Sequence, residues 1–370
     1  MYRSSFISTT LCLLVIGGCG KKTETATSPD SQLQETIASP APIDDPNSVA
    51  VIESVTDTIR RDGDAIIEVD FRGHEIDDES LLPLADLPRL RSVLLAGTGI
   101  SDEGLKTLGK ITTLESLDLR KCDVSDDGLA HLSSLAKLKS LRLSGEGGIC
   151  QVSDDGLSHL VGLANLKALS LDYLWVSEDG IQSLTGLNNL QELYLAETTI
   201  GNEAIALLAS FPNLRKLRLA KNGIDGEGLA HLPKLQKLEE LDLSECASIF
   251  DDAMAPLAEI GGLKKLNLWR VQISDAGIQP LEKLTELEYL NLDNTRLSDD
   301  GLAHLSGLNK LTFLHLGSTL ITDAGLVHLE GLTSLKNLIV TRTAVTQEGV
   351  DRLKQKLGDT EIQLKYIEDQ

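Results

Sequence analysis

The segment LESLDLRKCDVSDDGLAHLSSLAK, from Leu114 to Lys137, decides the fold of this 370-residue chain. Its opening phrase, L-x-x-L-x-L, alternates apolar and polar residues, which is typical of a short strand with one buried face. Ser125 and Asp126 then form a helix start, in which the hydroxyl caps a free N–H and the carboxylate suits the positive helix end. Leucines follow at three-residue spacing, as on one face of a short helix. A strand, a turn and a helix therefore fit within 24 residues.

The same frame returns about every 24 residues along most of the chain. The leucines that open it are Leu90, Leu114, Leu138, Leu166, Leu190, Leu214, Leu238, Leu263, Leu287, Leu311 and Leu335. A fixed period of this size indicates a solenoid, in which each unit buries its apolar side against its neighbours. We therefore expect an α/β solenoid with right-handed crossovers, a parallel β-sheet on the concave face and short helices on the convex face.

The recurring element x-[IV]-[ST]-D-x-G-L resembles the leucine-rich repeat family, and in particular the subgroup shared by F-box-type proteins and many bacterial envelope proteins. Examples are Ile100-Ser101-Asp102 and Ile273-Ser274-Asp275. The resemblance spans residues 66 to 364 and implies a binding protein. The array lacks the continuous asparagine ladder of many such repeats, because the corresponding position is mostly Thr or Cys, with Asn only at Asn222.

Two repeats are longer than the rest. The third carries about four extra residues in Ser144–Val152, and the seventh carries one, which we place near Ile260-Gly261-Gly262. Inserted loops of this kind are often functional, although sequence drift explains them equally simply.

The ends of the array should carry caps, since an open solenoid end exposes its core. We expect the repeat domain to span residues 48–370, with an N-terminal cap over 48–89, repeats over 90–357 and a C-terminal cap over 358–370. Asp45-Pro46 is a helix start, and Ile66 to Phe71 form a first strand. A last helix contains Leu353, and Ile362-Gln363-Leu364 form a closing strand.

The N-terminus has the pattern of an export and lipid-anchoring signal. Its apolar run from about Phe6 to Ile16 is too short to span a bilayer and indicates a cleavable signal peptide over residues 1–18. The sequence Ile16-Gly17-Gly18-Cys19 resembles the lipobox of bacterial lipoproteins, which implies lipidation of Cys19; Gly17 departs from the commoner Ala, Ser or Thr. An ordinary secretory signal is the alternative.

Residues 19–47 are rich in Ser, Thr, Pro and charge, and indicate a flexible tether. The resemblance to lipoproteins implies attachment to a membrane of the cell envelope through Cys19. Because Gly20 rather than Asp follows the cysteine, the outer membrane is favoured over the inner membrane.

The charge of the chain and the positions of its cysteines exclude one class of partner and a disulfide framework. The net charge of −22 repels nucleic-acid phosphates, so we expect no nucleic-acid partner. Cys122 and Cys246 occupy the same repeat position five repeats apart, roughly 24 Å at ~4.8 Å per strand, which is too far for a disulfide. We expect both thiols to be reduced, buried and structural, with Cys150 alone in the insertion.

The sequence indicates no catalytic or metal centre. Five histidines share one repeat position: His131, His159, His231, His304 and His328. Adjacent pairs lack a third ligand, so we interpret them as half-exposed helix residues and expect neither a metal nor another cofactor. The Asp-Asp pairs lack the spacing of a calcium loop and fit helix capping. No nucleotide-binding or hydrolase motif occurs, and we predict that the chain is not an enzyme.

The strand face is the best candidate for binding. Its outward positions are the third, fifth, seventh and eighth of each phrase, and over eleven repeats they hold nine basic and eight acidic residues, so this face is neutral within an acidic chain. Exposed aromatics beside Arg are typical of protein-binding hot spots. The predicted contact residues are Tyr173, Tyr194, Arg218, Trp269, Arg270, Tyr289 and Phe313.

These features predict a lipid-anchored envelope protein that binds a protein partner on its concave face. Two other functions fit the same sequence. The solenoid could be architectural and associate with its own copies, or the aromatics could bind carbohydrate such as peptidoglycan.

Overall fold

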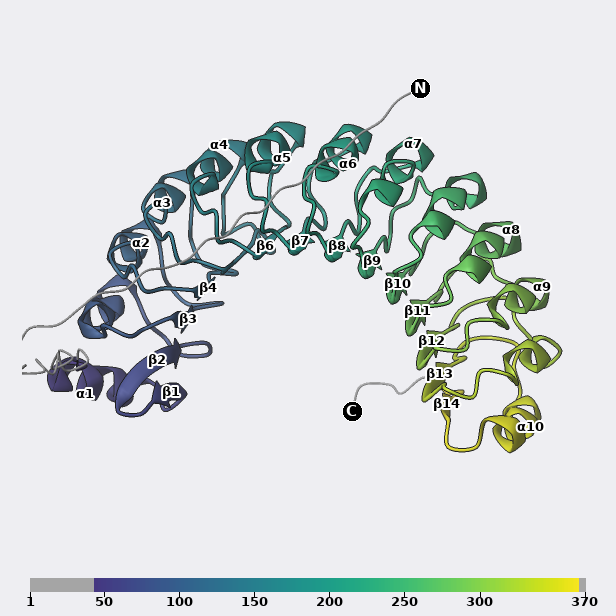
Figure 1. Ribbon diagram of the computed structural model, residues 1–370. Coiled ribbons are helices and arrows are strands. Elements are labelled where there is room, and N and C mark those ends of the chain that lie inside the picture. The colour runs from purple at the N-terminus through teal and green to yellow at the C-terminus, as the bar shows by residue number, and fades with distance from the viewer. Residues whose placement is uncertain (1–42, 366–370) are drawn as a thin grey trace, which may run out of the picture. The chain divides into compact units, whose positions relative to one another are not determined.

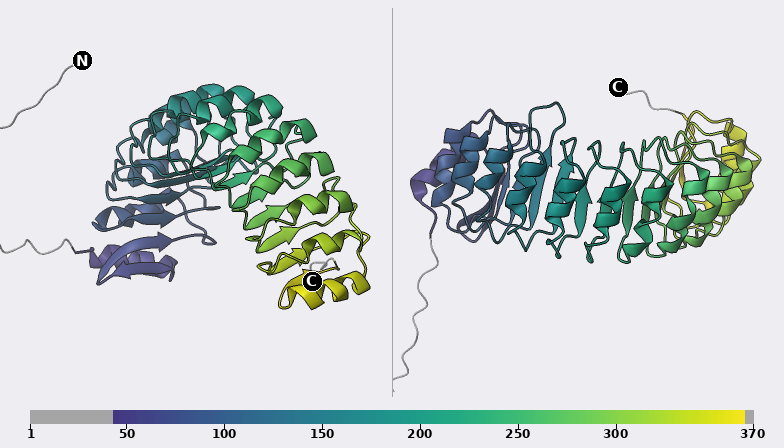
Figure 2. Two further views of the ribbon diagram at one scale, coloured as in Figure 1. Left: turned by 45° about the vertical axis from the view of Figure 1, so that its right-hand side comes forward. Right: turned by 90° about the horizontal axis from the view of Figure 1, so that it is seen from above.

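The computed structural model describes residues 43–365, within the compact unit that runs from Pro42 to the C-terminus. This unit is a solenoid in which one sheet lines the inner side of an arc and short helices line the outer side (Figure 1). The other views show the same two layers from the side and from above (Figure 2). The expected α/β leucine-rich-repeat solenoid is confirmed.

Fourteen strands in the described residues form the sheet in strict chain order. They are β1 (Ile59–Asp62), β2 (Ala65–Asp70), β3 (Ser92–Leu94), β4 (Ser116–Asp118), β5 (Ser140–Ser144), β6 (Ala168–Asp172), β7 (Glu192–Tyr194), β8 (Lys216–Arg218), β9 (Glu240–Asp242), β10 (Lys265–Asn267), β11 (Tyr289–Asn291), β12 (Phe313–His315), β13 (Asn337–Ile339) and β14 (Glu361–Gln363). The leucines of successive repeats are register partners, as in Leu266 with Leu290, and they form one continuous buried core.

The helical layer combines α-helices with 3-10 turns. The α-helices are α1 (Pro46–Val55), α2 (Asp102–Leu108), α3 (Asp126–Ala130), α4 (Asp154–Leu157), α5 (Glu178–Leu184), α6 (Asn202–Leu208), α7 (Gly226–Leu229), α8 (Asp275–Ile278), α9 (Asp299–Leu302) and α10 (Gln347–Leu357). The 3-10 segments are η1 (Asp78–Asp86), η2 (Ser158–Leu160), η3 (Leu232–Lys234), η4 (Asp251–Ala253), η5 (Ala255–Glu259), η6 (Gln279–Lys283), η7 (Ala303–Leu305) and η8 (Gly325–Leu329).

The two ends of the unit differ from the repeats. β2 and β14 lie where the sequence predicts the first and closing strands, but β1 was not predicted. β1 pairs with β2 in an antiparallel hairpin, whereas every later pair is parallel. The sequence of β1, Ile-Arg-Arg-Asp, is mostly polar because only one of its edges is covered, so it lacks the apolar alternation of a half-buried strand.

The N-terminal cap begins slightly earlier than the expected boundary at residue 48. Helix α1 starts at Pro46, and the Asp45 carboxylate caps it by accepting the N–H of Ser48 at 2.8 Å. Asp44 is buried and accepts the N–H of Ile66 at 2.6 Å, which ties the cap to β2. The predicted signal peptide, Cys19 and the tether before residue 43 lie outside the described residues. No helix between residues 43 and 365 is long and apolar enough to cross a membrane.

Most strands of the array are followed by a left-handed turn residue. The eighth position of the repeat has a φ between 51° and 64° at nine non-glycine residues, among them Lys121, Tyr173 and Arg270. The alternation of the sequence predicts these side chains on the sheet itself. The structure corrects this assignment, because the turn carries them to the rim where the chain leaves the strand.

The Ser-Asp element joins neighbouring repeats. The backbone N–H and the hydroxyl of Ser125 donate to the Asp102 carboxylate at 2.8 and 2.5 Å, and those of Ser153 donate to Asp126 at 2.7 and 2.6 Å. The same pair of bonds recurs from Asp78 to Ser101, Asp154 to Ser177, Asp251 to Ser274, Asp275 to Ser298, Asp299 to Thr322 and Asp323 to Thr346. Ser125 and Ser153 make no side-chain cap bond to their own helices, so the capping prediction is wrong there. It is confirmed at Ser101 and Ser177, which also accept the N–H of Glu103 and Asp179.

This carboxylate ladder explains the glycine of the D-x-G-L element. A Cβ on Gly128 would lie 2.8 Å from Cγ of Asp102 and closer still to its Oδ1. A Cβ on Gly156 would collide with the Asp126 carboxylate in the same way. The repeat thus needs an acid to bridge to the next serine and a glycine to leave room for that acid.

The ladder is interrupted at three consecutive links. Glu178 accepts only the N–H of Gly201, Asn202 replaces the acid before Asp225, and the third interruption lies between α7 and η4. Gly226 replaces the bridging acid there, and Phe250 replaces the serine and is 50% exposed. Asp251 resumes the ladder, and it precedes Leu263 by the same 12 residues that separate Asp126 from Leu138. The extra residue of the seventh repeat therefore lies between Cys246 and Asp251, and its predicted place near Ile260-Gly261-Gly262 is wrong.

The three cysteines in the described residues are free and buried, as predicted for Cys122 and Cys246. The Cys122 thiol donates to the carbonyl of Leu95 at 3.1 Å, and the Cys246 thiol donates to that of Leu219 at 3.2 Å. Burial raises the pKa of Cys246 to about 11, which keeps it a neutral thiol at physiological pH. These thiols replace the asparagine that other arrays use at this turn.

Candidate functional site

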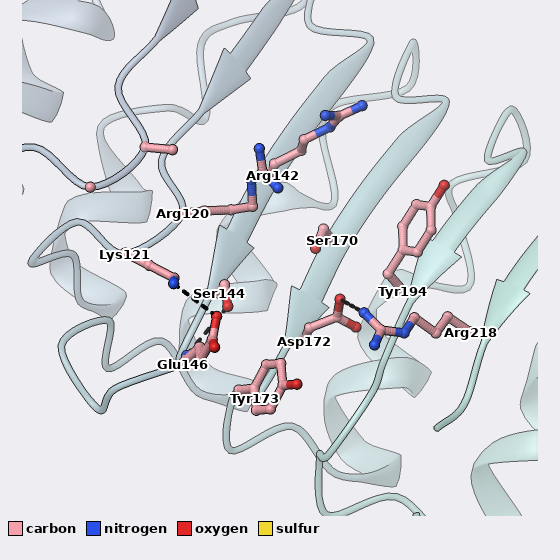
Figure 3. A pocket seen from close by; sticks show the side chains of 12 residues that line it. Arg120, Lys121, Arg142, Ser144, Glu146, Ser170, Asp172, Tyr173, Tyr194 and Arg218 are labelled. Atoms are coloured by element: carbon pink, nitrogen blue, oxygen red, sulfur yellow. Dashed lines mark hydrogen bonds and ion pairs between the residues drawn. The ribbon is translucent and has the colours of Figure 1, made fainter. Parts of the chain in front are cut away.

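Two hollows lie side by side on the concave face. The first has a volume of about 590 Å³ over β4 to β8, and the second has about 300 Å³ over β7 to β11. Both are lined by Tyr194 and Arg218, which are register partners on β7 and β8. Figure 3 shows the first hollow, with side chains from consecutive strands pointing into it. The two hollows form one continuous candidate surface for binding.

Ion pairs organise the floor of the first hollow. Arg218 donates to the Asp172 carboxylate at 2.9 Å and lies 3.3 Å from Asp242 (Figure 3). Asp172 also accepts the N–H of Ala196 at 2.7 Å. Burial raises the pKa of Asp172, whereas the amide and Arg218 oppose that rise. Burial lowers the pKa of Arg218, but the charges of Asp172 and Asp242 outweigh it, so the net shift is upward.

Aromatic side chains dominate the second hollow and its border. Tyr289 on β11 and Phe313 on β12 stack with ring centroids 4.5 Å apart and planes 4° apart. Tyr194 donates its hydroxyl to Glu192 at 3.0 Å, and burial raises its pKa to about 12. Both tyrosines are half-buried and held in place, which makes them pre-ordered contact residues.

Trp269 and Arg270 lie in the turn after β10. The Arg270 guanidinium lies over the Trp269 ring at 5.4 Å and forms an ion pair with Glu245 at 3.0 Å. Ring contacts among the described residues join Tyr289 to Phe313 and Phe313 to His315, and none of them reaches Trp269. The predicted patch is therefore two neighbouring groups, one at the rim and one on the sheet.

The structure brings most of the predicted contact residues to the hollows. Tyr173, Tyr194 and Arg218 line the first, and Tyr289 lines the second with Phe313 stacked against it. Sequence reasoning missed the basic residues of the first hollow, which are Arg120, Lys121 and Arg142. The spacing of 24 residues between Asp118 and Arg142 was visible, but that Asp118 pairs with Arg120 instead was not.

The repeated histidines lie on the helical side as half-exposed or exposed residues. His304 lies 3.3 Å from Glu282, and His231 lies 3.2 Å from Lys234. In residues 43–365, no three His, Cys, Asp or Glu side chains come close enough together to hold a metal ion.

Comparisons with known proteins find a matching family model and solved structures with a similar fold. The leucine-rich-repeat family model matches residues 110–133 and 212–232. An internalin from Listeria monocytogenes is similar with a TM-score of 0.56 at 19% identity, over 86% of this chain and 88% of that one. A TDR receptor is similar with a TM-score of 0.51 at 14% identity, over 86% of this chain and 57% of that one. No curated protein matches the sequence.

The sequence motif, the stacked strand-and-helix units and the family model all indicate leucine-rich repeats. Each strand and helix of the array falls on one period of the L-x-x-L-x-L phrase, and both matched segments lie within that array. The chain is a leucine-rich-repeat protein.

Proposed function

We propose that this protein is a binding scaffold that holds another protein on its concave face. The observation that carries the proposal is the pair of adjoining hollows, because their shared residues and the neighbouring aromatic stack are half-exposed and already fixed by contacts within the chain. Rigid aromatics and Arg lose little side-chain entropy on binding and are the commonest hot-spot residues.

Ring geometry favours a protein over a sugar as the occupant. A sugar stacks on a free aromatic face, and the contact of Tyr289 with Phe313 and of Arg270 with Trp269 leaves at most one face of each ring for it. Charged groups between the rings, such as Lys265 and Glu240 at 3.2 Å, suit the mixed polar rim of a protein interface.

We further propose that the scaffold is displayed from a membrane of the cell envelope, with the outer membrane favoured. The lipobox-like Ile16-Gly17-Gly18-Cys19 and the polar stretch that follows it support an anchor and a spacer. An anchored scaffold would present its concave face to partners at a distance set by that spacer.

The first test removes the aromatic anchors. Trp269→Ala combined with Tyr289→Ala is expected to weaken partner binding by at least tenfold, because each ring contributes apolar area at the interface. Both rings lie outside the buried leucine core, so the folded state should persist. The full chain, wild type or variant, is immobilised and exposed to envelope extract, and the retained proteins are quantified by mass spectrometry.

Trp175→Ala is the matched control, since Trp175 is 75% exposed in the loop between β6 and α5. It should leave retention unchanged, and thermal melting should confirm that all variants fold. Equal retention by the double variant and wild type would contradict the proposal. Retention of this chain alone would favour self-association, and retention of glycan without protein would favour carbohydrate binding.

A further inference from the structure

The first hollow gathers four basic side chains in a chain whose net charge is −22. The acids Glu146 and Asp172 also line it, and Asp118 and Asp242 lie against Arg120 and Arg218. Glu146 comes from the inserted loop Ser144–Val152 and pairs with Lys121 at 3.1 Å (Figure 3). Three of the four basic side chains are therefore paired with acids within or beside the hollow.

One guanidinium in this hollow lacks a counter-ion. Arg142 on β5 is exposed and forms no ion pair with any described residue, and no dashed line leaves it in Figure 3. Its register partner on β4 is Asp118, the acid best placed to neutralise it.

Asp118 is already engaged. Arg120 donates two hydrogen bonds to the Asp118 carboxylate at 2.8 and 2.6 Å, and Asp118 is only 2% exposed. On the other side of Arg142, the register partner is Ser170, whose hydroxyl donates to the Leu143 carbonyl at 3.1 Å. The acids of the hollow are thus satisfied, and the donors of Arg142 remain available.

We propose that the first hollow binds an acidic peptide segment, with a carboxylate of that segment on Arg142. The inference rests on the proposed function and specifies the chemistry of the partner. Arg binds a carboxylate through two parallel N–H donors, which gives both strength and orientation. Tyr194 and, further along the hollow, Tyr173 line it with Arg142 and supply contact area for the rest of the segment.

The dimensions favour a short peptide over a long polyanion. The hollow covers five strands, about 19 Å at ~4.8 Å per strand, which is the length of about six extended residues. A long polyanion would run past the hollow onto the rest of the concave face, which is neutral and offers it no further attraction. A peptide can instead place one or two carboxylates near Arg142 and neutral residues beside Asp172 and Glu146.

The test selects ligands without assuming their sequence. A displayed library of random decapeptides is panned against the immobilised full chain, and the selected peptides are sequenced. We expect Asp and Glu to be enriched at least threefold over the starting library. The enrichment should vanish with Arg142→Glu. It should persist with Arg296→Glu, which makes the same charge change at a residue hydrogen-bonded to Gln272, outside both hollows.

A selected peptide is then measured by fluorescence anisotropy against its Gln counterpart. The Gln peptide on wild type, and the acidic peptide on Arg142→Gln, should each bind about tenfold more weakly, because a charge-assisted bond is lost. No acidic enrichment, or equal losses with Arg142→Glu and Arg296→Glu, would overturn the inference.

Two further outcomes separate this inference from its premise. Panning that yields only neutral or basic peptides would overturn the acidic specificity while leaving a protein-binding concave face intact. Conversely, the proposed function fails when the Trp269 and Tyr289 variant keeps its partner, whatever the library selects. Displacement of bound acidic peptide by a sulfated glycan at lower concentration than by free peptide would assign the hollow to a polyanion and overturn the inference.

Discussion

Gly128→Ala is expected to lower the free energy of unfolding by about 2 kcal/mol, although alanine normally favours a helix over glycine. The added Cβ would collide with the Asp102 carboxylate of the preceding repeat and lie 3.2 Å from Cδ2 of Leu105. Because Asp102 is held by both the N–H and the hydroxyl of Ser125, it cannot move aside without breaking those bonds.

A double-mutant cycle tests this explanation. Asp102→Ala alone should cost about 1.5 to 3 kcal/mol through the loss of charge-assisted bonds. Once Asp102 is absent, Gly128→Ala should cost at least 1 kcal/mol less than it does in wild type, since the obstructing carboxylate is gone. The measurement is chemical denaturation followed by circular dichroism.

Gly162→Ala is the control, because a Cβ at Gly162 meets nothing within 4 Å. It should be neutral or slightly stabilising. Strictly additive effects of the Asp102 and Gly128 changes would contradict the proposed fit between the acid and the glycine.

Cys19→Ser is expected to move the protein almost entirely from the membrane fraction to the soluble fraction. The reason is that the proposed lipid is the only anchor that the sequence indicates, and acyl chains bind membranes through their buried methylene groups. The measurement is fractionation of cells expressing wild type or variant, followed by immunoblotting.

Cys12→Ser is the matched control, since Cys12 lies within the apolar run rather than after its small residues. It should leave the protein in the membrane fraction. Membrane association that survives Cys19→Ser would mean that the anchor lies elsewhere or that the signal is an ordinary secretory one.

The repeats were predictable because one pattern specifies them many times. Each leucine phrase predicts a strand, and its period predicts which strand lies next to it, so Leu266 and Leu290 pair as their spacing implies. The hairpin strand β1 contains no leucine phrase that would predict it. Its polar sequence resembles a loop, and it pairs only with β2.

The binding surface was only partly predictable. Alternation identified Tyr194, Arg218 and Tyr289 as outward-facing, and the structure places them around the two hollows. It did not indicate that Asp118 would pair with Arg120 and leave Arg142 without an acid, because that choice depends on side-chain geometry between adjacent strands. Nor did it place Trp269 at the rim, since the left-handed turn is formed by residues of many types.

Site-specific photo-crosslinking tests most directly whether the concave face is the binding face. A photoreactive amino acid is placed at Lys265, which lines the second hollow, or at Val327, which is 57% exposed on the helical side in η8. Illumination of living cells should yield a covalent adduct with another protein from position 265 and none from position 327. Adducts from position 327 alone, or equally from both positions, would contradict binding on the concave face.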